Sequence, residues 1–199
     1  MTHDHRLFAA FCDWISRREG QAQHRTREMV VSPLRGRVLE LGLGVGTNWK
    51  YLNHSVEYAG IDPDRHMLRR AAQYSSAGAR SWPIVQARAE QLPFADGAFD
   101  AVLATLTFCT VDDVPKALAE VRRVLKPDGK FHFWEHVRPA GRTRGVLLDA
   151  VAPVWRRVGA GCHPNRDTQA AIESAGFSLL ELRSSQMGPL PVIAGVASP

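Results

Sequence analysis

Apolar residues recur along the chain with two different periods. In the first thirty residues they return every three or four positions, which predicts an amphipathic helix. Its apolar positions are Leu7, Phe8, Phe11, Trp14 and Ile15. The polar stretch that follows is expected to continue as solvated helix up to Ser32, because Pro33 disfavours helix in the residue before it. From residue 37 onwards, short apolar runs of strand length alternate with segments of helical spacing.

This alternation predicts a sheet of mostly parallel strands. We expect five strands that are each followed by a helix or a turn, at residues 37–41, 56–61, 82–87, 99–106 and 130–134. The helices are expected at 47–52, at 64–77 between a capping Asp64 and Gly78, after Asp112 or Asp113, and at 166–175. Residues 127–129 should form a turn. Repeated strand–helix units with right-handed crossovers give a doubly wound α/β sheet.

The last two strands, at 177–182 and 190–196, follow each other without a long helix. We therefore expect them to pair antiparallel at one edge of a seven-stranded, Rossmann-like sheet. The predicted domain organisation is a helical lid at 1–32 and one α/β domain at 33–199, with a helical insertion at about 140–160.

Composition narrows the class of protein. The chain has 199 residues, 45% of them hydrophobic, which suits one globular domain. Its three cysteines are far apart and form no CxxC pair, which argues against a disulfide framework and a structural zinc site, so we expect no metal. No apolar run is long enough to span a bilayer and the first residues do not form a signal peptide, so we expect a cytoplasmic protein without an integral membrane segment.

The net charge of +5 comes from arginines spread along the chain in pairs, with only four lysines. A nucleic-acid binder usually gathers its charge on one face, so we interpret the arginines as a solvated surface and expect no nucleic-acid partner. The expected partner is a small molecule, and the chain could be a monomer or a homodimer.

The most informative stretch is the glycine-rich loop at 40–48, which follows the first strand. Its spacing is GxGxG and it contains neither the GxGxxG dinucleotide fingerprint nor a P-loop. Ligands bind at the carboxyl ends of strands in such sheets, and glycines let the backbone approach them closely. Asp62 ends the second strand, where an acidic side chain can accept hydrogen bonds from both ribose hydroxyls. The alternatives to a ligand site are a tight turn that needs glycine at the loop and a helix cap at Asp62.

Four motifs together resemble class I S-adenosylmethionine-dependent methyltransferases. They are the glycine loop at 40–46, Asp62, the segment at 89–100 and the segment at 120–129. Three further stretches, at 105–111, 133–137 and 159–168, resemble the microsomal alkyl-thiol methyltransferase family and its soluble bacterial relatives. The likeness covers about residues 33–197.

The resemblance implies a cofactor site for S-adenosyl-L-methionine, which leaves as S-adenosyl-L-homocysteine. The glycine loop would take the methionine portion with Glu40 near its ammonium, Asp62 would bind the ribose, residues 88–90 would lie on the adenine, and Thr105 and Leu106 would line the floor. Many relatives carry Asp at the position of Arg88, so the adenine amino group would need another partner. The full expected set is Glu40, Leu41, Gly42, Gly44, Gly46, Asn48, Asp62, Pro63, Ala89, Glu90, Thr105 and Leu106.

The favoured reaction is methylation of a small thiol. Thiols react as thiolates, so a nearby base helps. His136, at the end of the fifth strand, and His163, in the loop before a helix, are the candidate bases; the alternatives are a core histidine bonded to backbone and a loop residue that sets the Pro164 turn. Methylation at O, N or C of an aromatic, quinone-like or lipid-headgroup acceptor is the alternative, followed by a nucleic-acid-modifying or non-catalytic cofactor-binding protein. Four arginines near the acceptor side would favour an anionic acceptor if they line the pocket. These are Arg138, Arg142, Arg144 and Arg166.

Overall fold

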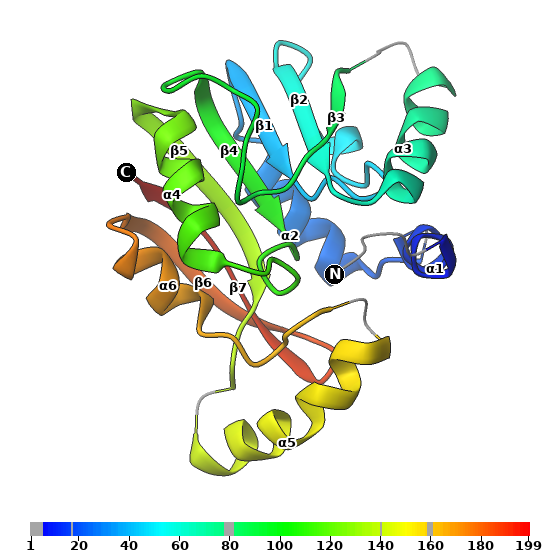
Figure 1. Ribbon diagram of the computed structural model, residues 1–199, viewed down its shortest axis with the longest axis vertical. Helices are drawn as coiled ribbons and strands as arrows, with labels where there is room; N and C mark the ends of the chain where they lie inside the picture. Colours follow the sequence, from blue (N-terminus) through cyan, green and yellow to red (C-terminus); the bar gives the residue numbers. More distant parts are fainter. Residues whose placement is uncertain (1–5, 17, 78–81, 140, 159–160) are drawn as a thin grey trace.

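The computed structural model describes residues 6–16, 18–77, 82–139, 141–158 and 161–199. Seven strands form one twisted sheet with helices on both faces (Figure 1). The strands are β1 (Arg37–Leu41), β2 (Glu57–Asp62), β3 (Ile84–Gln86), β4 (Phe99–Thr105), β5 (Leu125–His136), β6 (Ser178–Met187) and β7 (Leu190–Ser198). The helices are α1 (Arg6–Ser16), α2 (Gln21–Val31), α3 (Arg65–Ala77), α4 (Val114–Val124), α5 (Arg142–Val158) and α6 (Thr168–Ser174), with a 3-10 helix at Trp49–Tyr51.

The strand order is β3-β2-β1-β4-β5-β7-β6. The pairs from β3 to β5 are parallel, and β7 pairs antiparallel with both β5 and β6. This confirms the predicted doubly wound sheet with antiparallel strands at one edge. Because the order reverses between β1 and β4, the carboxyl ends of these two strands form the switch point, where ligands bind in open α/β sheets.

Two apolar layers hold the sheet between its helices. One lies under α4 and α6 and contains Leu118, Ile172 and Phe131, all with fully buried side chains. The other packs α2 against the opposite face through Val31 and Trp134. Asp113 caps α4 by accepting a hydrogen bond from the Lys116 amide at 3.0 Å, which fixes where that helix begins. The helices α1 and α5 lie beyond the carboxyl edge of the strands (Figure 1).

Several element boundaries differ from the expectation, and β6 (Ser178–Met187) is longer than the strand expected at 177–182. The N-terminal segment forms two helices, α1 and α2, instead of one. The expected helix at 47–52 is reduced to the 3-10 turn Trp49–Tyr51. The expected turn at 127–129 is a bulge within β5, where the register with β4 jumps from Leu125 to Lys130. The expected stop at Gly78 lies outside the described residues.

Within the described part of the chain, no helix combines the length and apolar character needed to cross a membrane.

Candidate functional site

The glycine loop after β1 turns through three left-handed positions. Gly42, Gly44 and Gly46 have φ of +60°, +56° and +82°, a region that side chains rarely adopt. A Cβ at Gly42 would come within 2.6 Å of the Thr107 side chain, and one at Gly46 within 2.8 Å of the Trp49 ring. Close packing therefore explains these two glycines without any ligand.

Gly44 is different, because it is open. The nearest heavy atom to a Cβ placed there is the Gly42 carbonyl oxygen at 4.0 Å. The Gly44 amide donates to Asp62 Oδ2 at 3.0 Å, so an acidic side chain lies directly beside the exposed backbone. This arrangement fits a ligand that approaches the loop backbone and offers hydroxyl groups to a carboxylate, as the ribose part of S-adenosylmethionine does.

Asp62 is held by its own neighbours. Its second oxygen, Oδ1, accepts from the Asp64 amide at 2.8 Å, and burial raises the pKa of the carboxyl to about 6. A carboxylate can accept about four hydrogen bonds, so two positions stay available for ligand hydroxyls. Pro63 follows directly, and its carbonyl accepts from the Gln86 side chain at 3.0 Å, which ties the turn to β3.

Glu40 is buried at the end of β1, and each of its two oxygens accepts one hydrogen bond. Asn48 Nδ2 and the Tyr58 hydroxyl each donate to one of its oxygens at 2.6 Å. Burial raises the pKa of Glu40 to about 7. The side chain of Leu41 points into the core instead, and its carbonyl accepts from Thr107 Oγ1 at 3.0 Å.

Arg27 on α2 joins this network and was missed by the sequence reasoning. Its guanidinium is 7% exposed and donates to Asn48 Oδ1 at 2.7 Å and to Thr105 Oγ1 at 3.3 Å. It also forms a buried ion pair with Glu19 at 2.6 Å. Because it lies in a polar helix that looked wholly solvated, no pattern in the sequence separated it from its exposed neighbours.

The expected adenine side is built by residues 88–90. Ala89 and Glu90 are buried, and Glu90 Oε1 accepts from the amides of Asp112 at 3.0 Å and Asp113 at 3.3 Å. The Arg88 guanidinium pairs with Asp112 at 2.6 Å and with Glu90 at 3.2 Å, so we do not assign Arg88 to the adenine.

The turn after β4 is fixed from β5. Leu106 is the one non-glycine residue with positive φ (56°) among the described residues, and its amide donates to the Trp134 carbonyl at 2.7 Å. Glu135, fully buried, accepts from the amides of Thr107 at 2.8 Å and Phe108 at 3.1 Å. Burial raises the pKa of Glu135 to about 7. These hydrogen bonds hold the turn in place and so fix the position of the residue that follows it, Cys109.

Cys109, His136 and Cys162 meet beside this turn. One ligand atom from each lies within 4.8 Å of the other two. His136 is 7% exposed, and neither of its ring nitrogens has a hydrogen-bond partner among the described residues. The neighbouring Cys109 thiol, followed by His136, lowers the pKa of the Cys162 thiol.

The second candidate base, His163, adjoins this cluster. Its backbone amide donates to the Cys109 carbonyl at 2.6 Å. Burial, followed by the charges of Arg166 and Arg156, lowers the pKa of its ring, so the ring is neutral and able to accept a proton near pH 7. Both candidate bases therefore lie at the same end of the site.

The arginines expected on the acceptor side do not gather there. Arg138 forms a half-exposed ion pair with Asp149 at 2.7 Å. Arg166 donates to the Phe108 carbonyl and is the one described arginine of the four that lies at the cysteine cluster. The side chains of Arg142 and Arg144 lie outside the described part of the structure.

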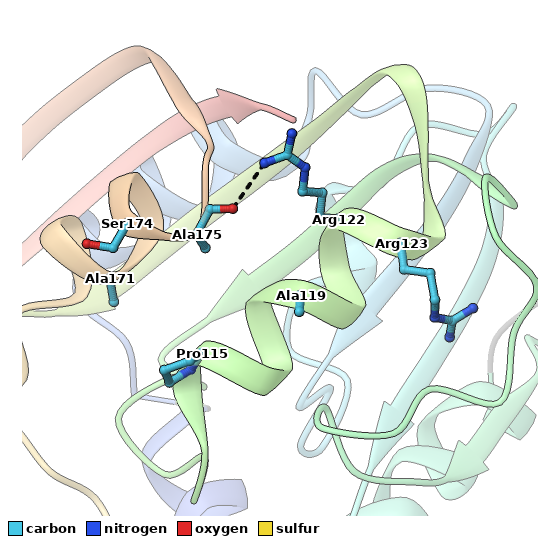
Figure 2. A pocket seen from close by; sticks show the side chains of 7 residues that line it. All are labelled: Pro115, Ala119, Arg122, Arg123, Ala171, Ser174 and Ala175. Carbon is cyan, nitrogen blue, oxygen red and sulfur yellow. Dashed lines mark hydrogen bonds between the residues drawn. The ribbon is translucent and has the colours of Figure 1, made fainter.

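A groove of about 550 Å³ lies elsewhere, between α4 and α6 (Figure 2). Its wall is formed by small side chains and by two arginines. Arg122 donates to the Ala175 carbonyl at 3.1 Å, and Arg123 pairs with Glu120 at 2.7 Å, so both cations are already used. Its lining contains no residue of the glycine loop, of the turn at 88–90 or of the cysteine cluster, and we assign no part of the site to it.

Comparison with known proteins agrees with this geometry. Residues 39–133 match the family described as a methyltransferase domain. The structure of YcgJ from Bacillus subtilis superposes with a TM-score of 0.74 at 19% identity, covering 88% of this chain and 98% of that one, which shows a shared fold. The matched segment is therefore a methyltransferase domain of the class I S-adenosylmethionine-dependent type, and its cofactor is S-adenosyl-L-methionine.

Two curated relatives refine the likeness. Thiol S-methyltransferase TMT1B from Rattus norvegicus is 34% identical over 150 residues, which are 73% of this chain and 61% of the rat protein. Thiol S-methyltransferase TMT1A from Homo sapiens is 32% identical over 154 residues, which are 75% of this chain and 63% of the human protein. The chain thus spans somewhat less than two thirds of the length of these relatives.

Proposed function

We propose that the protein transfers the methyl group of S-adenosyl-L-methionine to a small thiol. The observation that carries this proposal is the 34% identity to a thiol S-methyltransferase over 73% of the chain. The buried imidazole beside the turn after β4 supports it, because an imidazole can take the proton of a thiol bound there.

The cofactor supplies a methyl group already activated on a sulfonium. The task of the protein is to hold a nucleophile in line with that methyl group and to exclude water, and such positioning can contribute about 7–11 kcal/mol. We assign the ribose to Asp62 and the adenine to the turn at Ala89 and Glu90. Thr105 and Leu106 would form the floor under the methyl group.

We assign the methionine end of the cofactor to the network around Glu40. In this proposal Glu40 attracts the ammonium group while Asn48, held by its bond to Glu40, presents its own polar atoms. Arg27 would turn from Asn48 and Thr105 to the methionine carboxylate, because its guanidinium is the buried cation nearest to both. Arg27→Met should then weaken S-adenosylhomocysteine binding, and leave binding of 5′-methylthioadenosine, which lacks the carboxylate, nearly unchanged.

Residues 1–32 are proposed to act as a lid on the domain formed by 33–199. Ala9 packs against Val45 of the glycine loop and Met67 of α3, which supports a covering role for α1. Cys12 faces the same region, and burial, followed by the charges of Asp62 and Asp64, raises the pKa of its thiol to about 12. Cys12 would therefore be a neutral packing group and no nucleophile. The insertion at about 140–160, which contains α5, would flank the acceptor side.

His136 and His163 are the proposed proton acceptors for the incoming thiol. His163 has the lowered pKa that keeps its ring neutral, and His136 has two ring nitrogens without partners among the described residues. The half-buried Arg166 guanidinium would stabilise the thiolate electrostatically, and this supports an acceptor that is anionic when it reacts.

One panel assay tests the proposal. The purified chain is incubated with radiolabelled S-adenosylmethionine and, in separate reactions, with alkyl thiols, phenols, quinols and tRNA. Turnover on thiols well above the others is the expected result. Turnover on phenols or quinols without turnover on thiols would refute thiol methylation while leaving the methyltransferase class intact, and labelled tRNA would refute the small-molecule acceptor.

A further inference from the structure

Three soft or borderline metal ligands converge beside the turn after β4. Cys109 follows β4, His136 ends β5, and Cys162 lies in the loop between α5 and α6. The three positions are more than twenty residues apart in the sequence, and the meeting of strand ends brings them together. The proposed function uses His136 only as a base and gives the two thiols no role.

The separations suit a single ion. In a tetrahedral site with metal–sulfur bonds of about 2.3 Å and metal–nitrogen bonds of about 2.0 Å, neighbouring ligand atoms lie about 3.4–3.8 Å apart. The three ligand atoms here lie within 4.8 Å of one another, so they need to close by no more than about 1.4 Å to share an ion. Side-chain rotation at Cys162, which lies in a loop, can supply most of that movement.

The imidazole of His136 gives an independent sign of a ligand. Buried polar atoms in proteins are nearly always hydrogen-bonded, yet both ring nitrogens of His136 lack a partner among the described residues. At 7% exposure the ring cannot satisfy them from solvent. A metal ion at the cluster would take one nitrogen as a ligand.

The backbone around the cluster is already held in place. The His163 amide donates to the Cys109 carbonyl at 2.6 Å, and Glu135 accepts from the amides of Thr107 and Phe108. The backbone at Cys109 and the backbone at His136 are therefore fixed relative to each other before any metal binds, which lowers the entropic cost of binding. Two thiolates and one neutral imidazole match a divalent ion in charge.

We propose that Cys109, His136 and Cys162 bind one Zn²⁺ ion and leave its fourth position open for the sulfur of the acceptor. Thiolate and imidazole ligands favour zinc, and three protein ligands with an open position are typical of catalytic zinc sites. The role of the open position rests on the proposed thiol methylation, whereas the metal site itself does not. Cys109 Sγ lies 3.5 Å from the Leu106 carbonyl, so the ion would lie next to the proposed floor of the cofactor site.

The reaction at this site balances without another reactant. The acceptor thiol loses its proton to solvent as its sulfur binds the metal. A lone pair on the acceptor sulfur forms the new bond to the methyl carbon. The bond between that carbon and the sulfonium sulfur breaks, and its electron pair stays on the sulfur of S-adenosylhomocysteine. His136 is then a metal ligand and no longer a proton acceptor.

Cobalt(II) is the probe for the test, because it replaces zinc and reports its ligands by absorption. The full chain, reduced with a phosphine and freed of metal, is titrated with Co²⁺ alone. We expect one equivalent to bind, with intense thiolate-to-cobalt charge-transfer bands and the visible bands of a tetrahedral ion. Cys162→Ser and Cys109→Ser should each lower the charge-transfer absorption and weaken Zn²⁺ binding more than about tenfold, because each removes one of three ligands.

Cys12→Ser is the matched control, since it removes the third cysteine, which lies on α1 away from the cluster. It should leave the cobalt spectrum unchanged. Cys162→Ser is the safer of the two ligand variants for folding, because it alters a loop, and S-adenosylhomocysteine binding by each variant checks that the fold is intact. Bands that survive in both ligand variants, or the lack of any one-equivalent site, would overturn the proposal.

The open position is tested with 2-mercaptoethanol on the cobalt form. A saturable rise in charge-transfer absorption, absent with ethylene glycol, is expected, and no change would overturn the role given to the fourth position. Thiol turnover by a protein that binds no Co²⁺ would overturn the metal site and leave thiol methylation standing. A one-equivalent cobalt–thiolate site without turnover of any thiol would support the metal site and overturn thiol methylation.

Discussion

Asp62 offers the sharpest test of the cofactor site, and Asp62→Asn is the change to make. The variant keeps an oxygen near the Gly44 or Asp64 amide but removes the charge beside the open loop. Hydrogen bonds to charged groups contribute about 1.5–3 kcal/mol, so replacing the carboxylate by an amide should weaken S-adenosylhomocysteine binding about 10- to 150-fold. Isothermal titration calorimetry measures this directly.

A ligand without the 2′-hydroxyl separates ribose recognition from damage to the loop. In the wild type, 2′-deoxy-S-adenosylhomocysteine should bind much more weakly than S-adenosylhomocysteine, whereas Asp62→Asn should bind the two almost equally. Asp64→Asn is the control, because Asp64 lies two positions after Asp62 and caps α3. Its Oδ1 accepts from the His66 amide at 2.7 Å. Equal discrimination between the two ligands by wild type and Asp62→Asn would refute the ribose role.

Affinity should also depend on pH through the same group. The pKa of Asp62 is raised to about 6 by burial, and the hydroxyl groups of the ligand favour the ionised carboxylate. Binding should therefore weaken as the pH falls through about 6, and this dependence should be smaller in Asp62→Asn. A wild-type affinity that is constant between pH 5 and 8 would contradict the assignment.

Three further outcomes are expected. Gly46→Ala should lower the free energy of unfolding by about 1–3 kcal/mol more than Gly44→Ala does, since both residues have positive φ but only the Cβ at Gly46 would lie 2.8 Å from the Trp49 ring, whereas Gly44→Ala should lose more of the S-adenosylhomocysteine affinity; the reverse order would refute the distinction. Burial raises the pKa of Glu40 from 4.5 to about 7, so the contribution of this group to the free energy of unfolding is complete below pH 4.5 and is lost as the pH rises through about 7, by at most about 3 kcal/mol. Urea unfolding at several pH values should therefore show a flatter pH dependence in Glu40→Gln than in the wild type. Phe131→Ala should cost about 3–5 kcal/mol in urea unfolding, because the fully buried ring lies 5.5–5.8 Å from three other phenylalanine rings, and a loss below about 1 kcal/mol would show that the core refills the space.

Local patterns were enough to predict the fold. The apolar run at residues 99–105 becomes the central strand β4, and the absence of a long helix between the last two strands correctly predicts their antiparallel pairing. The predicted boundaries of helices and strands were wrong where a tertiary contact overrides local propensity. The clearest case is the proline–aspartate–glycine sequence at 127–129, which stays within β5 as a bulge because the strand resumes its pairing with β4 at Lys130.

The candidate site likewise contains residues that the sequence predicted and residues that it did not. Residues of one contiguous motif, such as Gly44, could be placed beside Asp62 because parallel strands end at one edge of the sheet. Arg27 could not be found, since its importance comes from burial against Asn48 across two elements. The cysteine cluster was invisible for a related reason, because no spacing rule connects Cys109 with Cys162 until the chain is folded.

The position of β7 between β5 and β6 has a consequence for how the chain assembles. β6 is synthesised first, yet among the described strands it forms strand hydrogen bonds with β7 alone, and β7 in turn pairs with β5. During synthesis β6 must therefore wait until residues 190–198 have emerged, and the two strands then add to the sheet as a hairpin. Until that moment the edge of β5 at Glu135 and His136 is uncovered, so the proposed acceptor end of the site is completed last.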